Sequence, residues 1–134
     1  MRTIELMKGI EFNDNNPQAQ LLHGNEEGRV FRFAFLPGQG LEPHRAPSSP
    51  IHMIVIQGKG AFAGEDGVER ICSEGMMVSF DAGETHSVRA LDEILVFISV
   101  YKEAPSSHNS EYRKQVEAAR QHHSHPQGET NDVS

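Results

Sequence analysis

The chain of 134 residues has one cysteine, no tryptophan and few basic side chains, with 12 Lys and Arg against 19 Asp and Glu. A single cysteine excludes an intramolecular disulfide and a cysteine-rich zinc module. The net charge of −7 argues against nucleic acid and anionic membrane surfaces as partners, because both attract basic patches. The longest mainly apolar runs, residues 51–56 and 94–98, are too short to span a bilayer. Residues 1–10 lack the apolar core of a signal peptide, so we expect a cytoplasmic protein.

Histidine is abundant, with eight copies, and the composition of the chain changes near residue 104. Nearly all strand-like runs come before this point, whereas Ser, Asn, Gln and His dominate after it. We therefore predict one domain over residues 1–104 and a loose, His-rich tail over residues 105–134. Within the tail, apolar side chains at positions i, i+4 and i+7 predict a short α-helix over residues 110–121.

Short apolar runs between turn residues predict strands, and no helix, within residues 29–101. The first run alternates Phe with Arg and Ala, as in a strand with one buried face. Turns are expected at residues 58–60, 64–67 and 91–93. The predicted strands are residues 29–36, 51–57, 61–63, 68–72, 76–80, 86–90 and 94–101. This spacing is typical of an antiparallel sandwich or barrel.

Alternate positions of three of these runs predict the apolar inner wall of the barrel. The wall residues are Phe31, Phe33 and Phe35, then Ile51, Met53 and Val55, and then Ile94, Val96, Ile98 and Val100. Small barrels fill their interior with side chains, so a cavity remains only where small residues leave room. We expect Ala46 to leave such room beside His44.

Two stretches of the chain have a specific spacing of Gly and His. The first reads Gly38-x5-His44-x-Ala46, followed by Ile51-x6-Gly58, and the second reads Gly75-x5-Asp81-x-Gly83-x2-His86-x3-Ala90. They resemble the two motifs of the cupin superfamily, which in full form are Gly-x5-His-x-His with a following Glu-x6-Gly, and Gly-x5-Pro-x-Gly-x2-His-x3-Asn. The resemblance implies an all-β fold, the cupin-like double-stranded β-helix or jelly-roll barrel. It also implies a small organic ligand at the open end of the barrel and a homodimer paired through its sheets.

The metal ligands of the family carry over only in part. His44 matches the first His and His86 matches the His of the second motif, whereas Ala46 and Ile51 stand where a second His and the Glu belong. By the resemblance, the metal is Fe, Mn, Ni or Zn, held by three or four such ligands. Two imidazoles alone rarely hold a divalent ion tightly, so the site holds either an incomplete metal centre or no metal.

His52 is the candidate for a third metal ligand. Strand alternation places it on the opposite face from Ile51 and Met53, unless a bulge after Pro50 turns its side chain inward. The alternative is a role at a strand edge or a subunit contact. The remaining histidines match no motif: His23 lies in a predicted turn, and the others, His108, His122, His123 and His125, lie in the tail.

We therefore predict a pocket lined by His44, Ala46, Ile51, Met53 and His86, and two functions remain open. In the first, the pocket holds a divalent metal and a small organic ligand, and enzymatic activity on that ligand is left open. In the second, it is a metal-free binding or sensing barrel, in which the two imidazoles serve as hydrogen-bonding groups. The fold does not choose between them, because one fold hosts many functions.

Overall fold

The computed structural model describes residues 1–45 and 48–102, and within them the chain forms β-strands and no helix. The seven strands are β1 (Gln18–Asn25), β2 (Gly28–Phe35), β3 (Gly40–Arg45), β4 (Ile51–Ala63), β5 (Arg70–Ser73), β6 (Met77–Phe80) and β7 (Thr85–Tyr101). The described part of the chain therefore contains no helix that could cross a membrane. The predicted all-β class is confirmed, whereas the predicted boundary at residue 104 and the helix over residues 110–121 lie outside the described residues.

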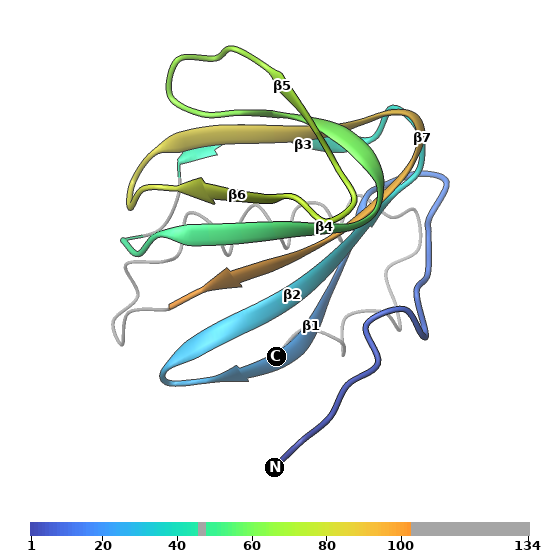
Figure 1. The fold of residues 1–134 in the computed structure, drawn as a ribbon, viewed down its shortest axis with the longest axis vertical. Helices are drawn as coiled ribbons and strands as arrows, with labels where there is room; N and C mark the ends of the chain where they lie inside the picture. The colour runs from blue at the N-terminus through green and yellow to red at the C-terminus, as the bar shows by residue number, and fades with distance from the viewer. Residues whose placement is uncertain (46–47, 103–134) are drawn as a thin grey trace.

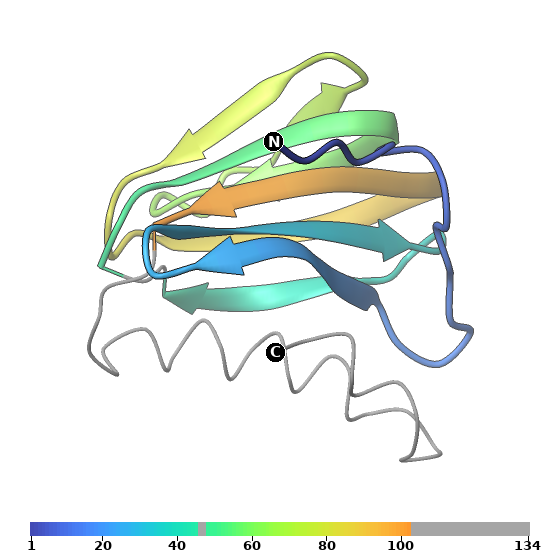
Figure 2. The same cartoon turned by 90° about the horizontal axis from the view of Figure 1, so that it is seen from below.

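Two long antiparallel strands, β4 and β7, run through both layers of the fold (Figure 1). In the first layer, the start of β4 pairs with the end of β7, and β1, β2 and β6 extend this sheet on either side. In the second layer, the end of β4 pairs with the start of β7, and β5 and β3 flank them. Figure 2 shows the same strands after a turn of 90°. This is a jelly-roll arrangement, in which two sheets enclose one core.

Three predicted turns are wrong, because the strands continue where turns were expected. Residues 58–60 belong to β4, residues 91–93 belong to β7, and His23 lies within β1. Gly58 lets β4 bend without ending, because its φ of 80° is open to glycine and costly for other residues. The pairing of β4 with β7 shifts register on both sides of Gly58, as a β-bulge does where a strand turns from one layer into the next.

The inner wall is apolar, as predicted for β2 and β4, but the prediction for β7 has the wrong parity. The residues of β7 that join the core are Leu95, Phe97 and Tyr101 together with Val88 and Ala90. Val96 and Ile98 are also buried, but they alternate with the core residues and therefore lie on the other face of β7. Since both faces of this strand are covered, its sequence carries no alternation that identifies the inner one.

The N-terminal segment is fastened to the outer face of the first layer by Arg32 of β2. The guanidinium donates through Nη1 to the backbone carbonyls of Leu6 and Lys8, at 2.9 and 2.8 Å. It donates through Nη2 to the carbonyl of Gly9 and to Oε1 of Gln20, at 3.0 and 2.6 Å. Arg32 faces outward beside Ile98 and is nevertheless buried, so this segment forms a cover over that part of the sheet.

Candidate functional site

The fold brings His44 and His86 together on neighbouring strands of the second layer. They are direct cross-strand partners of β3 and β7, and their ring centroids are 4.4 Å apart. Both side chains are buried, and the ring of Phe80 stacks on the His86 ring at 4.5 Å. The structure thus places the two motif histidines side by side, and it adds the contact with Phe80, which was not predicted. Phe80 lies directly before Asp81 of the second motif, at the end of a predicted strand.

Both imidazoles are oriented by a backbone carbonyl two residues earlier in the chain. Nδ1 of His44 lies 2.8 Å from the carbonyl oxygen of Glu42, and Nδ1 of His86 lies 3.3 Å from that of Glu84. A carbonyl oxygen only accepts hydrogen bonds, so each Nδ1 carries the proton and donates it. In a neutral imidazole, Nε2 then holds the lone pair. The two buried Nε2 atoms are thus the basic atoms of the pair.

The environment keeps His86 neutral. Burial, and to a smaller extent the neighbouring His44, lower the pKa of His86 to about 4, against the opposing effect of the Glu84 carbonyl and carboxylate. Desolvation has this effect because it disfavours the charged form of an imidazole. At neutral pH, His86 is therefore a neutral imidazole with its lone pair on Nε2, and not a cation.

This lowered pKa predicts a loss of stability in mild acid. Between pH 6.5 and about 4 the unfolded chain binds a proton at His86 that the folded protein does not. The contribution of neutral His86 to the free energy of unfolding is therefore fully present above pH 6.5 and falls below it. From pH 7.5 to 4.5 this group should lower the free energy of unfolding by about 2.5 kcal/mol. Urea unfolding at the two pH values measures the loss.

The matched variants are His86→Gln and His52→Gln, because one removes the buried imidazole and the other an exposed one. The decrease in the free energy of unfolding from pH 7.5 to 4.5 should be about 2.5 kcal/mol smaller in His86→Gln than in the wild type. In His52→Gln it should equal that of the wild type. Equal declines in all three proteins would contradict the assignment of this effect to His86.

The turn that supplies the carbonyl to His86 is braced by two glutamates. The Glu84 carboxylate accepts hydrogen bonds from the backbone N–H groups of Asp81 and Glu65, at 2.8 and 3.1 Å. In return, the Glu65 carboxylate accepts from the N–H of Thr85 at 2.9 Å. This link between the turn and the loop after β4 gave no signal in the sequence.

His52 does not join the pair. It is exposed on β4, between the fully buried Ile51 and Met53, and its Nδ1 lies 2.8 Å from Oγ of Ser79 on β6. Strand alternation therefore holds, and no bulge turns His52 inward. Within residues 1–45 and 48–102, no group of three or more His, Cys, Asp and Glu side chains is arranged to hold a metal ion.

The other predicted pocket residues take different positions. Ile51 and Met53 are completely buried members of the core, and Ala46 lies outside the described residues. A groove of about 580 Å³ borders His86 along β7 and is lined on its other sides by β3 and the loop between β4 and β5. The Arg89 guanidinium of this groove forms a bidentate ion pair with the Glu69 carboxylate. Nε donates to Oε2 at 2.7 Å and Nη2 donates to Oε1 at 2.9 Å.

The two-layered barrel with a His pair on β3 and β7 is a jelly-roll protein. Comparison with known proteins leads to the same class. The family model described as the Cupin domain matches residues 31–101, and the chain belongs to the cupin family. A search of curated proteins gave no match.

Solved structures of the same fold agree with this assignment. A RmlC-like cupin protein from Desulfovibrio desulfuricans is 24% identical, with a TM-score of 0.68 over 75% of this chain and 96% of that one. TT1209 from Thermus thermophilus is 21% identical, with a TM-score of 0.73 over 78% of this chain and 100% of that one. An uncharacterized conserved protein with a double-stranded β-helix domain from Klebsiella pneumoniae is 18% identical, with a TM-score of 0.71 over 78% and 92%. At these identities the likeness is one of fold.

Proposed function

We propose that this cupin binds a small organic ligand in its barrel, with His44 and His86 as the polar groups that orient the ligand and without a resident metal. The observation that carries the proposal is the paired orientation of the two rings, each with Nδ1 directed at a backbone carbonyl. Their Nε2 atoms are then acceptors for a ligand that carries a hydroxyl or amine hydrogen. The ring of Phe80 against His86 suits an apolar ligand body.

The donor set does not fit a tightly bound divalent ion. Zinc, iron, manganese and nickel sites use three or more protein ligands, and the described residues bring only two imidazoles together. Ile51, at the position of the family's Glu, offers a hydrocarbon side chain that cannot coordinate a metal. The chemistry proposed for the pocket is therefore recognition through hydrogen bonds.

A second candidate function is a weak metal centre that a ligand completes. It is favoured by one observation, the Nδ1–carbonyl hydrogen bond of each ring, because metal-ligating histidines use the same support for Nε2 coordination. In that case, His44 and His86 would hold the ion, and oxygen atoms of a small molecule or of water would fill its other positions. The two candidates differ in whether binding of the organic ligand needs a metal.

Phenol and anisole are a matched pair of probes, because they share an aromatic body and only phenol has a hydrogen to donate. We expect phenol to shift the imidazole proton resonances of His44 and His86 in an NMR titration of metal-stripped protein, and anisole to bind about tenfold more weakly. Full-length protein carrying His122→Ala, His123→Ala and His125→Ala should be used, since the tail tract can bind metal itself.

The same protein before stripping, and after reconstitution with Fe, Mn, Ni or Zn, gives the metal content by mass spectrometry. We expect much less than one ion per chain, and no change when His44→Ala and His86→Ala are added. Stoichiometric metal that disappears in this double variant, together with phenol binding only in its presence, would overturn the metal-free proposal and establish the second candidate.

A further inference from the structure

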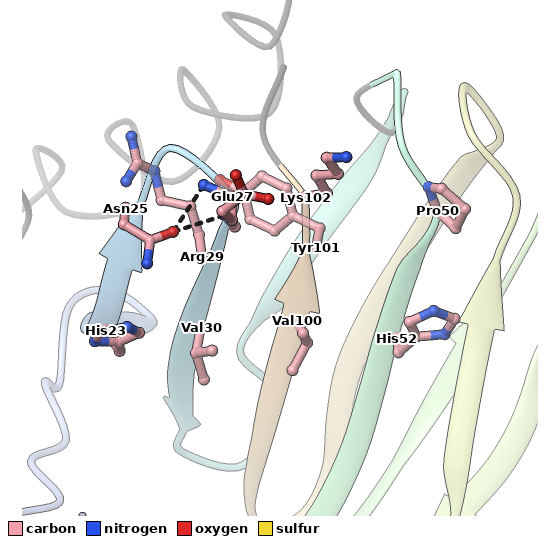
Figure 3. Close-up of a pocket in the computed structure, with 11 residues that line it drawn as sticks. His23, Asn25, Glu27, Arg29, Val30, Pro50, His52, Val100, Tyr101 and Lys102 are labelled. Carbon is pink, nitrogen blue, oxygen red and sulfur yellow. Dashed lines mark hydrogen bonds between the residues drawn. The ribbon is translucent and has the colours of Figure 1, made fainter. Parts of the chain in front are cut away.

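The outer face of the first layer is apolar along β7, and its burial stops before the end of the strand. Val96 and Ile98 lie on this face and are buried, whereas Val100, the next residue of the same parity, is partly exposed. Its cross-strand partner, Val30 of β2, is partly exposed as well. Figure 3 shows the two valines side by side, with Lys102 beyond them at the end of β7. The apolar outer face therefore extends past its covered part.

A groove of about 390 Å³ lies over these two valines. Its lining is mainly apolar, and Pro50 and His52 border it on the β4 side. The lining also includes charged groups of both signs, so charge does not distinguish an anionic from a cationic occupant. Apolar contact is therefore the interaction that this groove offers, and a segment with an apolar face is the kind of partner that it fits.

The chain itself supplies such a segment next to the groove. Lys102, the last residue that the structure describes, lines the groove, and residues 103–134 follow it. In their sequence, Tyr112, Val116 and Ala119 have the spacing that places them on one face of the helix predicted over residues 110–121. An isolated helix of this length is marginal in water, so it depends on contact with other protein surface.

We propose that residues 110–121 dock in this groove as an amphipathic helix, with the ring of Tyr112 over the two valines. Residues 103–109 span up to about 24 Å when extended, which lets the chain turn back and bring Tyr112 over Val100. Because the segment is tethered at Lys102, its effective concentration at the groove is high, whereas a second copy of the chain has to bind from solution. Docking removes apolar surface of both the helix and the sheet from water.

This docking site goes beyond the function proposed for His44 and His86 and does not depend on it. The groove lies on the outer face of the first layer, whereas the imidazole pair belongs to β3 and β7 in the second layer. The phenol response of the two histidines should therefore be the same whether or not residues 110–121 are docked, so the two proposals can fail separately.

Tyr112→Trp in the full-length protein is a single fluorescent reporter of docking, because the chain contains no other Trp. We expect its emission maximum at a shorter wavelength than that of an exposed indole, and several-fold weaker quenching by acrylamide, since docking shields the ring from water. Val116→Asp, added to this protein, should abolish both effects, because a carboxylate on the apolar face of the helix opposes burial. Val133→Asp lies in the same tail but outside the predicted helix, and it should leave both effects unchanged.

Val100→Asp tests whether the groove is the surface to which the helix docks. It should expose the indole as Val116→Asp does, whereas Val68→Asp, which replaces an exposed valine outside the groove, should have no effect. Circular dichroism checks that both variants keep the β-sheet fold. If Val100→Asp does not fold, Val100→Thr keeps the shape of valine and should give a smaller change in the same direction.

An indole that is fully exposed in Tyr112→Trp, or equal effects of Val100→Asp and Val68→Asp, would overturn the proposal. A second copy of the chain is the other possible occupant, and sedimentation equilibrium tests for it. If the emission moves to longer wavelength on dilution as a dimer dissociates, another copy fills the groove and intramolecular docking is refuted. Emission that does not depend on concentration and is lost in Val100→Asp supports it.

Discussion

Gly58→Ala should destabilise the protein by about 3 kcal/mol or more, because it combines a disfavoured backbone conformation with a backbone clash. The φ of Gly58 is 80°, and a Cβ atom at this position would lie 1.9 Å from the carbonyl oxygen of Ile94. That oxygen belongs to β7, which is paired to both β4 and β2 and has little freedom to move. Urea unfolding followed by circular dichroism measures the loss.

Gly67→Ala is the matched control for Gly58→Ala. Its φ of 72° is as unfavourable for alanine, but no atom lies within 4 Å of the added Cβ. It should therefore cost only the conformational part, about 1 kcal/mol. If Gly58→Ala does not fold, its failure alongside a folded Gly67→Ala gives the same ranking. Equal losses in the two variants would contradict the role assigned to the close approach of β4 and β7.

Gly58 also explains why the strand boundaries could not all be predicted from the sequence. A glycine between polar residues is the usual signal of a turn, and residues 58–60 match that signal. The register of β4 against β7 continues to Ala63 because the bulge absorbs the bend. Whether a glycine ends a strand or bends it depends on a partner strand more than 30 residues later, which local patterns do not contain.

The residues of β7 that face the core could not be predicted for a related reason. Ile94 to Tyr101 is almost continuously apolar, and such a run is expected for a strand with both faces covered. The outer face is covered by the N-terminal segment, whose backbone carbonyls accept hydrogen bonds from Arg32. Its sequence, with a mixture of polar and apolar residues, gave no reason to place it on that sheet.

Two features of the candidate site residues could be predicted from the sequence. The motif spacing selected His44 and His86 among eight histidines, and strand alternation placed His52 outward, as the structure also does. The tautomers were not predictable, because they depend on carbonyl groups of Glu42 and Glu84 whose directions are set by local backbone geometry. The stacking of Phe80 on His86, which removes water from the ring, likewise depends on how β6 and β7 meet.

We expect the second large loss of stability from a substitution in the aromatic cluster of the first layer. Phe97 is completely buried, stacks on Phe33 at a centroid distance of 4.9 Å, and meets the edges of Phe35 and Phe62 at 5.4 and 5.8 Å. Phe97→Ala should lower the free energy of unfolding by about 4 kcal/mol, because it removes a large buried side chain and leaves a cavity that stacked rings cannot close.

Phe97→Leu and Met77→Ala are controls for this prediction. Leucine keeps most of the buried volume and should cost about 1–2 kcal/mol, and the exposed Met77 should cost less than about 0.5 kcal/mol. Losses of similar size in Phe97→Ala and Met77→Ala would contradict the contribution to core stability assigned to the aromatic cluster. The His44–His86 pair lies in the other layer, on β3 and the start of β7. Phe97→Leu should therefore keep the imidazole resonances and phenol response of the wild type, which separates support of the barrel from the chemistry of its site.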